Sequence, residues 1–220
     1  MEKRGLLIGN YDTAAEQWTL TEWKLDDPQA VTNLVDVPGR RAGPLDLSTA
    51  LTDGDPVYGG RPLAATFECS EGTRLEREDK ISEMINALDG WRLNIVLPDD
   101  PYKYVTGRVS VAKVYNDLAH ASVKVTATCE PWRYNATETA VVLTASTTAK
   151  TAALRNNGRL ALVPMLQVSG GDVVLVYGSH SWGLSEGTYA LPDLLLLHGE
   201  NVITYSGTGT LTFTYREAVL

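Results

Sequence analysis

Alternation of apolar and polar residues with a period of two is the dominant pattern of this 220-residue chain. It runs through residues 63–69, 91–97 and 123–129, and each run would place its apolar residues on one face of an extended strand. In the second run, that face consists of Trp91, Leu93, Ile95 and Leu97. A helix needs an apolar residue at every third or fourth position, so this alternation predicts a mainly β protein.

One segment has a helical period instead. Its apolar residues are spaced as on one side of a helix, namely Ile81, Met84, Ile85 and Leu88. Glu76, Glu78 and Asp79 lie near its start, where the helix dipole favours negative charge, and Gly90 is suited to end it. We expect one amphipathic helix within residues 74–90, packed against a sheet.

The pattern changes again around residues 130–135, and a stretch rich in Thr and Ala follows. We therefore predict two domains, residues 1–132 and 133–220. The second consists of short alternating runs separated by Gly- and Asn-containing turns about ten residues apart, which predicts a β-sandwich or jelly roll. Pro164 lies beside one of these strands and predicts that this strand is an edge or contains a bulge.

Composition excludes several classes of function. The chain has 27 Asp and Glu against 19 Lys and Arg, a net charge of -8, so it lacks the basic surface that grips nucleic acid. Cys69 and Cys129 are its two cysteines, too few for a disulfide framework, and both fall on apolar strand faces as buried thiols. We expect neither a signal peptide nor a membrane span, because no apolar stretch of about 18 residues occurs.

A search for catalytic groups finds nothing that favours an enzyme. Ser179 and His180 are adjacent in sequence, and in a strand adjacent residues would point to opposite faces, so they do not form a catalytic pair. His120, His180 and His198 lack metal-ligand spacing. The pairs Asp26-Asp27 and Asp99-Asp100 each precede a proline, which is typical of turns. A hydrolase using Asp99 or Asp100 is a minor alternative, and we expect no catalytic residue, no metal and no cofactor.

The chain has five Trp and ten Tyr but only two Phe. Trp and Tyr rings carry a polar group, so this excess favours contacts at partly solvated surfaces and interfaces. Trp182 falls in a Gly- and Ser-rich segment, residues 178–183, that we expect to be a loop on the sandwich. There it could stack on a sugar, cap the sandwich core, or contact a partner. A carbohydrate-binding module for host-surface recognition is therefore the alternative function.

Several segments, in order, carry a resemblance to a known family. They are GNYDT at 9–13, VDVPGRRAGPLDL at 35–47, YGGRPL at 58–63, the expected helix, and LPDDPYKY at 97–104 followed by GRV at 107–109. Further motifs at 157–164, 187–189, 199–201 and 207–217 extend it to the second domain. The chain resembles the siphophage distal tail protein (Dit) family, a component of the bacteriophage tail tip or baseplate.

The resemblance implies structural work in the virion. In this family, N-terminal domains form a hexameric ring that continues the tail tube of a long non-contractile tail, and galectin-like sandwiches lie outside it. The implied partners are other copies of the chain, the major tail tube protein and the tail-associated lysin or hub protein. A receptor-binding protein is a further partner in some relatives, and DNA only passes through the lumen. Such a protein is assembled in the host bacterial cytoplasm, without contact with a membrane.

We expect the subunit contact at the loop containing Pro38, Gly39, Arg40 and Arg41, together with Tyr58 and Arg61. The proline restricts the backbone there, and two guanidinium groups lie next to each other. The same residues would also fit a simple turn with solvated arginines, so both interpretations stay open.

Overall fold

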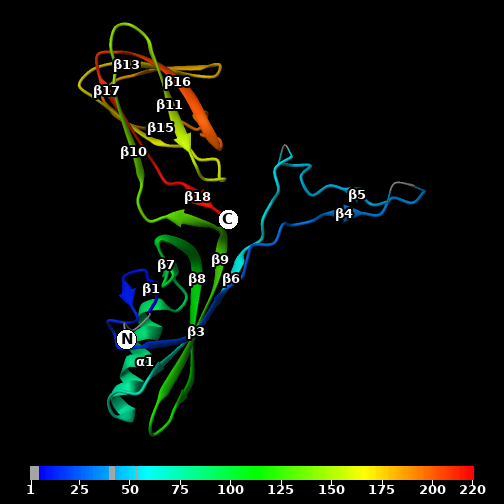
Figure 1. The fold of residues 1–220 in the computed structure, drawn as a ribbon, viewed down its shortest axis with the longest axis vertical. Coiled ribbons are helices and arrows are strands. Elements are labelled where there is room, and N and C mark those ends of the chain that lie inside the picture. The colour runs from blue at the N-terminus through cyan, green and yellow to red at the C-terminus, as the bar shows by residue number, and fades with distance from the viewer. Residues whose placement is uncertain (1–4, 40–42, 53) are drawn as a thin grey trace. The chain divides into compact units, whose positions relative to one another are not determined.

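The computed structural model describes residues 5–39, 43–52 and 54–220. By its internal contacts the chain divides into two compact units, Met1–Pro131 and Trp132–Leu220. Strands account for 54% of the chain and helix for 7% (Figure 1), which confirms the prediction of a mainly β protein with one helix.

Unit 1 is built on one antiparallel sheet. Across the sheet, the strands follow the order β2 (Tyr11–Asp12), β1 (Leu7–Ile8), β7 (Arg92–Leu97), β8 (Asp100–Asn116), β9 (Ala121–Asn135), β6 (Arg61–Cys69) and β3 (Thr19–Leu25). The inner sides of these strands form an apolar core with Trp18, which is fully buried. Cys69 and Cys129 belong to this core as free thiols, as predicted, and burial raises the pKa of Cys129 to about 11.

Helix α1 (Arg74–Leu88) covers the core side of this sheet. Thr73 caps its N-terminus: the Thr73 hydroxyl accepts from the Glu76 amide, and the Glu76 carboxylate accepts from the Thr73 amide at 2.6 Å. Ile81, Met84 and Leu88 are buried, whereas Ile85 is half-buried at the margin of the stripe. The predicted helix is therefore confirmed, and Gly90 follows it with a φ of +78°.

Unit 2 consists of two four-stranded sheets that enclose one core. One sheet has the order β10 (Thr139–Thr144), β17 (Thr210–Tyr215), β12 (Met165–Ser169), β15 (Gly187–Ala190). The other has the order β11 (Lys150–Asn156), β16 (Gly199–Gly207), β13 (Val173–Tyr177), β14 (His180–Leu184). On β17, Leu211, Phe213 and Tyr215 point inward and the threonines between them lie nearer the surface. The predicted sandwich is thereby confirmed.

The last strand of unit 2 returns to its first residues. Strand β18 (Ala218–Val219) pairs with Arg133 and Tyr134 at the end of β9. The nearly buried Glu217 carboxylate accepts hydrogen bonds from the Asn157 amide at 2.9 Å and from the Asn135 side chain at 3.3 Å. These contacts hold the two ends of unit 2 together.

Three sequence-based expectations were wrong. Trp91 precedes β7 and is 62% exposed instead of sharing its apolar face. The predicted edge strand next to Pro164 is β12, which lies between β17 and β15; the proline precedes the strand, so the ladder does not need its missing N–H. Trp182 lies within strand β14, not in a loop, because the turn occurs earlier at Gly178, which has a φ of +56°.

Candidate functional site

Residues 26–60, which we call the arm, connect two neighbouring strands at one margin of the unit 1 sheet. The arm leaves β3 after Leu25 and returns at Arg61, the start of β6. Within it, β4 (Leu34–Val35) and β5 (Leu45–Asp46) pair with each other as a narrow ribbon (Figure 1). Further backbone bonds continue this ladder, among them Val31 N–H to Val57 O at 2.8 Å. The arm is thus a two-stranded ribbon within the described residues.

The apolar side chains of the arm are exposed. Between 37% and 60% of the surface of seven of them is accessible, and Leu51 is 99% exposed; the seven are Val31, Leu34, Val35, Val37, Leu45, Leu47 and Val57. A two-stranded ribbon without a covered face is at best marginally stable in water. Exposed apolar groups of this extent typically mark a surface that another molecule covers.

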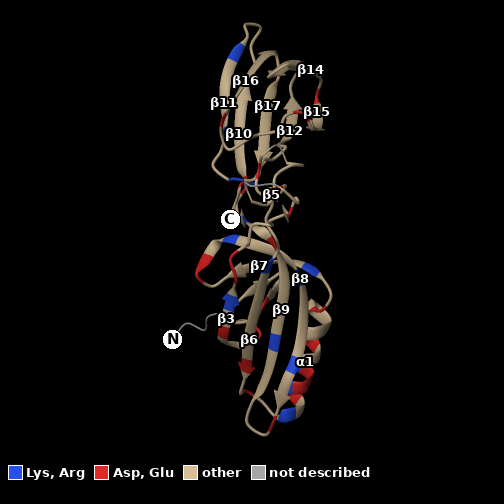
Figure 2. Cartoon of the chain, turned by 90° about the vertical axis from the view of Figure 1, so that its right-hand side faces the viewer, with Lys and Arg blue, Asp and Glu red and all other residues tan. Residues whose placement is uncertain are grey.

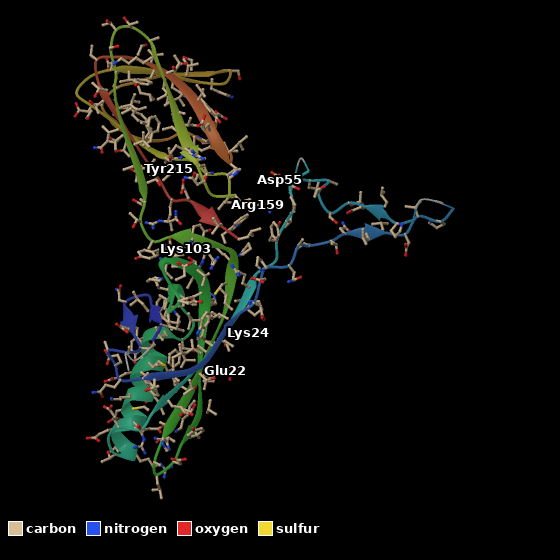
Figure 3. The ribbon with its side chains drawn as sticks, in the orientation of Figure 1. Glu22, Lys24, Asp55, Lys103, Arg159 and Tyr215 are labelled. Atoms are coloured by element: carbon tan, nitrogen blue, oxygen red, sulfur yellow. The ribbon has the colours of Figure 1, made fainter. Side chains whose placement is uncertain are left out.

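The base of the arm is fixed by a buried arginine. The Arg61 side chain donates from Nε to the Asp26 carbonyl at 2.9 Å and from Nη2 to the Asp27 carboxylate at 3.1 Å. Lys24, at the end of β3, pairs with Asp26 at 2.6 Å (Figure 3 labels Lys24). Arg61 is only 4% exposed, so its side chain anchors the arm and is not displayed to a partner.

The other predicted contact residues occupy different parts of the arm. Pro38 and Gly39 are exposed where β4 ends, and Gly39 has a φ of +82°. Tyr58 is half-buried near the base, in a bridge with Ala30. Arg40 and Arg41 lie outside the described residues. The structure therefore places Arg61 and Tyr58 near the base of the arm, and Pro38 and Gly39 beyond β4, away from the base.

Sequence reasoning found part of the arm but missed its extent. It selected one loop, whereas the whole of residues 26–60 stands outside the core. Two signals were available in the sequence: this stretch breaks the period of two, and its charge is unusual. It contains six aspartates and two arginines, a net charge of -4, which is half of the chain's net charge of -8.

Trp182, the candidate sugar-contact residue, faces the core of the sandwich. Its register partner on β13 is the fully buried Leu175, and its ring is half-buried against the core. The His180 ring stacks on it with a centroid distance of 5.7 Å and an interplanar angle of 11°. One face of the indole is therefore occupied by a neighbouring side chain, and the part left accessible is smaller than a loop position would provide.

The two carboxylates considered for hydrolysis lie where the chain turns into β8. Asp99 lies in the turn before β8, and Asp100 begins that strand and pairs with Lys103 at 3.3 Å. Among the residues that the structure describes, no group of three or more His, Cys, Asp and Glu is arranged to hold a metal ion. In the same part of the chain, no helix has the length and apolar character needed to cross a membrane.

Neither a family model nor a curated protein sequence matches the chain. Among solved structures, it is similar to the crystal structure of the SPP1 Dit protein (gp 19.1), described as a paradigm of the hub adsorption apparatus in phages that infect Gram-positive bacteria. The two share 14% sequence identity with a TM-score of 0.66, over 96% of this chain and 98% of SPP1 Dit. Over nearly its whole length, the chain thus has the fold of a phage Dit protein.

Proposed function

We propose that the chain is a non-enzymatic structural subunit of a phage tail tip that works as an assembly of several copies. The observation that carries this proposal is the arm: a ribbon of apolar side chains that the chain itself leaves uncovered. The fold shared with SPP1 Dit supports the same role, since that protein is described as part of a hub adsorption apparatus.

In its full form the proposal is a hexameric ring at the distal end of a long non-contractile tail. Unit 1 would form the ring and unit 2 its outer, galectin-like domain, between the tail tube protein and the hub or tail-associated lysin, with a receptor-binding protein as a further partner. Ring closure is a favourable arrangement for a sheet with open margins, because a closed ring leaves no free edge for uncontrolled pairing. The net negative charge of the chain suits the passage of DNA, because carboxylates repel the phosphates and so do not hold the DNA in place.

The proposal places the protein in the virion, after assembly in the cytoplasm of the host bacterium. It also gives the loop of Pro38, Gly39, Arg40 and Arg41 a contact with a neighbouring copy, while Tyr58 and Arg61 would hold the base of the arm. This role for the loop requires that the arm contact another copy of the chain. The exposed apolar side chains of the arm support such a contact.

Deletion of the arm tests the proposal. Ala30 and Tyr58 form a bridge, so residues 31–57 can be replaced by a short Gly-Ser linker without stretching the base. We expect light scattering after gel filtration to give a multi-subunit mass for the intact protein, negative-stain images to show an open ring, and the deletion variant to be monomeric. Circular dichroism serves as the control that both proteins are folded. An intact protein that stays monomeric at every concentration would contradict the proposal.

A further inference from the structure

Strand β10 (Thr139–Thr144) is an unprotected sheet margin in unit 2. It is the last strand of its sheet, next to β17, and its sequence, TAVVLT, contains no charged residue, proline or glycine. The other three marginal strands of the sandwich, all within the described residues, differ: β11 carries Lys150 and Arg155, while β14 and β15 are shorter and contain glycine. Proteins usually block pairing at such margins with charge, proline or short strands. The composition of β10 therefore suits it to pair with a further strand.

The register on β17 determines which backbone groups of β10 point outward. Ala145, directly after the strand, donates its amide to the Gly209 carbonyl at 2.9 Å, so the odd-numbered residues of β10 bond to β17. The N–H and C=O groups of the even-numbered residues Ala140, Val142 and Thr144 consequently point away from the sheet. Each of these three residues offers one donor and one acceptor to a strand laid beside β10.

The side chains around this margin are uncharged. Val141 and Leu143 pack against the sandwich core, whereas the even-numbered residues face outward and Val142 is 62% exposed. The register places six uncharged residues beside them on the outer face of the sheet: Thr210, Thr212 and Thr214 of β17, and Met165, Gln167 and Ser169 of β12. Two copies that meet at β10 therefore bring no like charges together on this face.

We propose that β10 pairs in antiparallel orientation with β10 of a second copy of the chain, so that two sheets of four strands join into one. The strand is self-complementary about Val142, because a two-fold axis there places this residue opposite its own copy. Ala140 then lies opposite Thr144 on the outer face, and outward donors meet outward acceptors. On the core side, Val141 lies opposite Leu143. The contact uses the same surface on both copies, and it goes beyond the proposed function, whose ring is formed by unit 1.

Opposite charges meet at both ends of the paired strands. In this register, Glu138 of one copy lies opposite Ser146 of the other. The Lys150 ammonium donates to the Thr144 carbonyl at 3.4 Å, two residues along the strand from Ser146, which is about 7 Å. The Glu138 carboxylate also lies 3.1 Å from Arg216 of its own chain, and a carboxylate can accept from both cations. Lys150 of one copy is thus within reach of Glu138 of the other, and the two-fold axis repeats this pair.

The contact is small, so we expect weak association of single copies. The six residues of β10 are far fewer than the roughly 20–30 residues a side of a standard interface, and pairing should need a protein concentration of about 0.1 mM or more. At the lower concentrations of gel filtration, it leaves the mass expected for the arm-deletion variant unchanged. Where several copies are already held together, several such contacts act at once and strengthen one another.

Cross-linking at the two-fold position tests the inference in the full-length chain. Val142→Cys places two thiols on opposed residues with Cβ atoms about 5 Å apart, so a short bismaleimide should join two copies about tenfold more efficiently than at an unpaired site. Val202→Cys is the matched control, because Val202 is 60% exposed on the other sheet. Cys69 and Cys129 are about 1% exposed and do not compete.

Exchange of charge at the same position provides a second measurement. Val142→Lys and Val142→Glu each place two like charges opposite each other, so each variant alone should lose the species of doubled mass that sedimentation equilibrium detects in the wild type. An equimolar mixture of the two variants should recover it, because Lys then lies opposite Glu. Val142→Thr keeps the β-branched shape and the outward N–H, and it should pair like the wild type.

The outcomes separate this inference from the proposed function. If Val142→Cys cross-links no better than Val202→Cys, or if the mixed Lys and Glu variants do not recover the doubled species, the inference is wrong, and deletion of the arm still decides the proposed function. If the wild type pairs through β10 but forms no larger assembly, the proposed function fails and the inference stands.

Discussion

A single buried arginine joins helix α1 to the hairpin of β8 and β9. Arg77 is 2% exposed, and its guanidinium donates to the carbonyls of Gly72 at 2.6 Å, Asp117 at 2.9 Å and Leu118 at 3.2 Å. Its Nε also donates to the Asn116 side chain at 3.4 Å. This arrangement uses the planar, multiple-donor geometry of guanidinium, which an ammonium group cannot reproduce.

Replacement of Arg77 by Met should therefore destabilise unit 1 by about 2 kcal/mol or more, because several carbonyls lose their donor. Urea unfolding followed by circular dichroism measures the change. Arg77→Lys should restore only part of the loss. Arg74→Met, at an exposed position on the same helix, is the matched control and should change stability by less than about 0.5 kcal/mol. Equal effects at the two positions would contradict this role for Arg77.

At the scale of elements, the Glu78 carboxylate connects helix α1 to β8. The Glu78 carboxylate accepts from Lys113 at 2.6 Å and 2.7 Å and from the Asn116 side chain at 2.8 Å. These hydrogen bonds lower the pKa of Glu78 below 4.5, and backbone amides of His120 and Ala119 lower that of Asp117 below 3.8. Figure 2 shows acidic and basic residues together along α1.

The sign of these shifts predicts acid sensitivity. Since the unfolded chain binds these protons more readily than the folded one, the stabilisation is complete above the unfolded pKa and is lost as the pH falls through the folded pKa. We expect the free energy of unfolding to decrease below about pH 4.5. Glu78→Gln should lower stability at pH 7, with a difference from wild type that shrinks at pH 3. Glu83→Gln, exposed on the same helix, should show no such convergence.

The elements that the sequence predicts well are those in which local pattern and burial agree. The helix has its capping residues and its stripe, and residues 211–215 alternate as a sandwich strand must. Trp91 fits the same alternation but lies outside the strand, because the helix terminus and Gly90 set where β7 begins. Arg77 could not be recognised as buried, since two of the carbonyls to which it donates, those of Asp117 and Leu118, are about 40 residues away in sequence.

The candidate site was only partly predictable, because the burial of its residues depends on contacts between segments that are far apart in the sequence. Pro38, Gly39, Tyr58 and Arg61 could be singled out as residue types, but their division into an exposed end and a buried base depends on the long connection between β3 and β6. Exposure of the arm's aliphatic residues also has no local signal. Trp182 shows the opposite error, because a Gly- and Ser-rich neighbourhood does not exclude a strand.

At the scale of the whole molecule, each unit has a core of its own. Unit 2 also secures its own ends, through the pairing of β18 with Arg133 and Tyr134. We therefore expect a fragment of residues 132–220 to fold alone and to unfold cooperatively in a thermal scan monitored by circular dichroism. A fragment without a cooperative transition would show that unit 2 depends on unit 1 for its fold.

The exposed arm also bears on the fate of copies that have not met a partner. A narrow ribbon with accessible backbone and aliphatic side chains is what cellular proteases and chaperones select, whereas the core of each unit is protected. If neighbours cover the arm as proposed, the lifetime of each copy depends on whether it has found a neighbour. Surplus subunits would then be degraded first, because their arms stay uncovered. The arm would thus mark subunits that have not assembled.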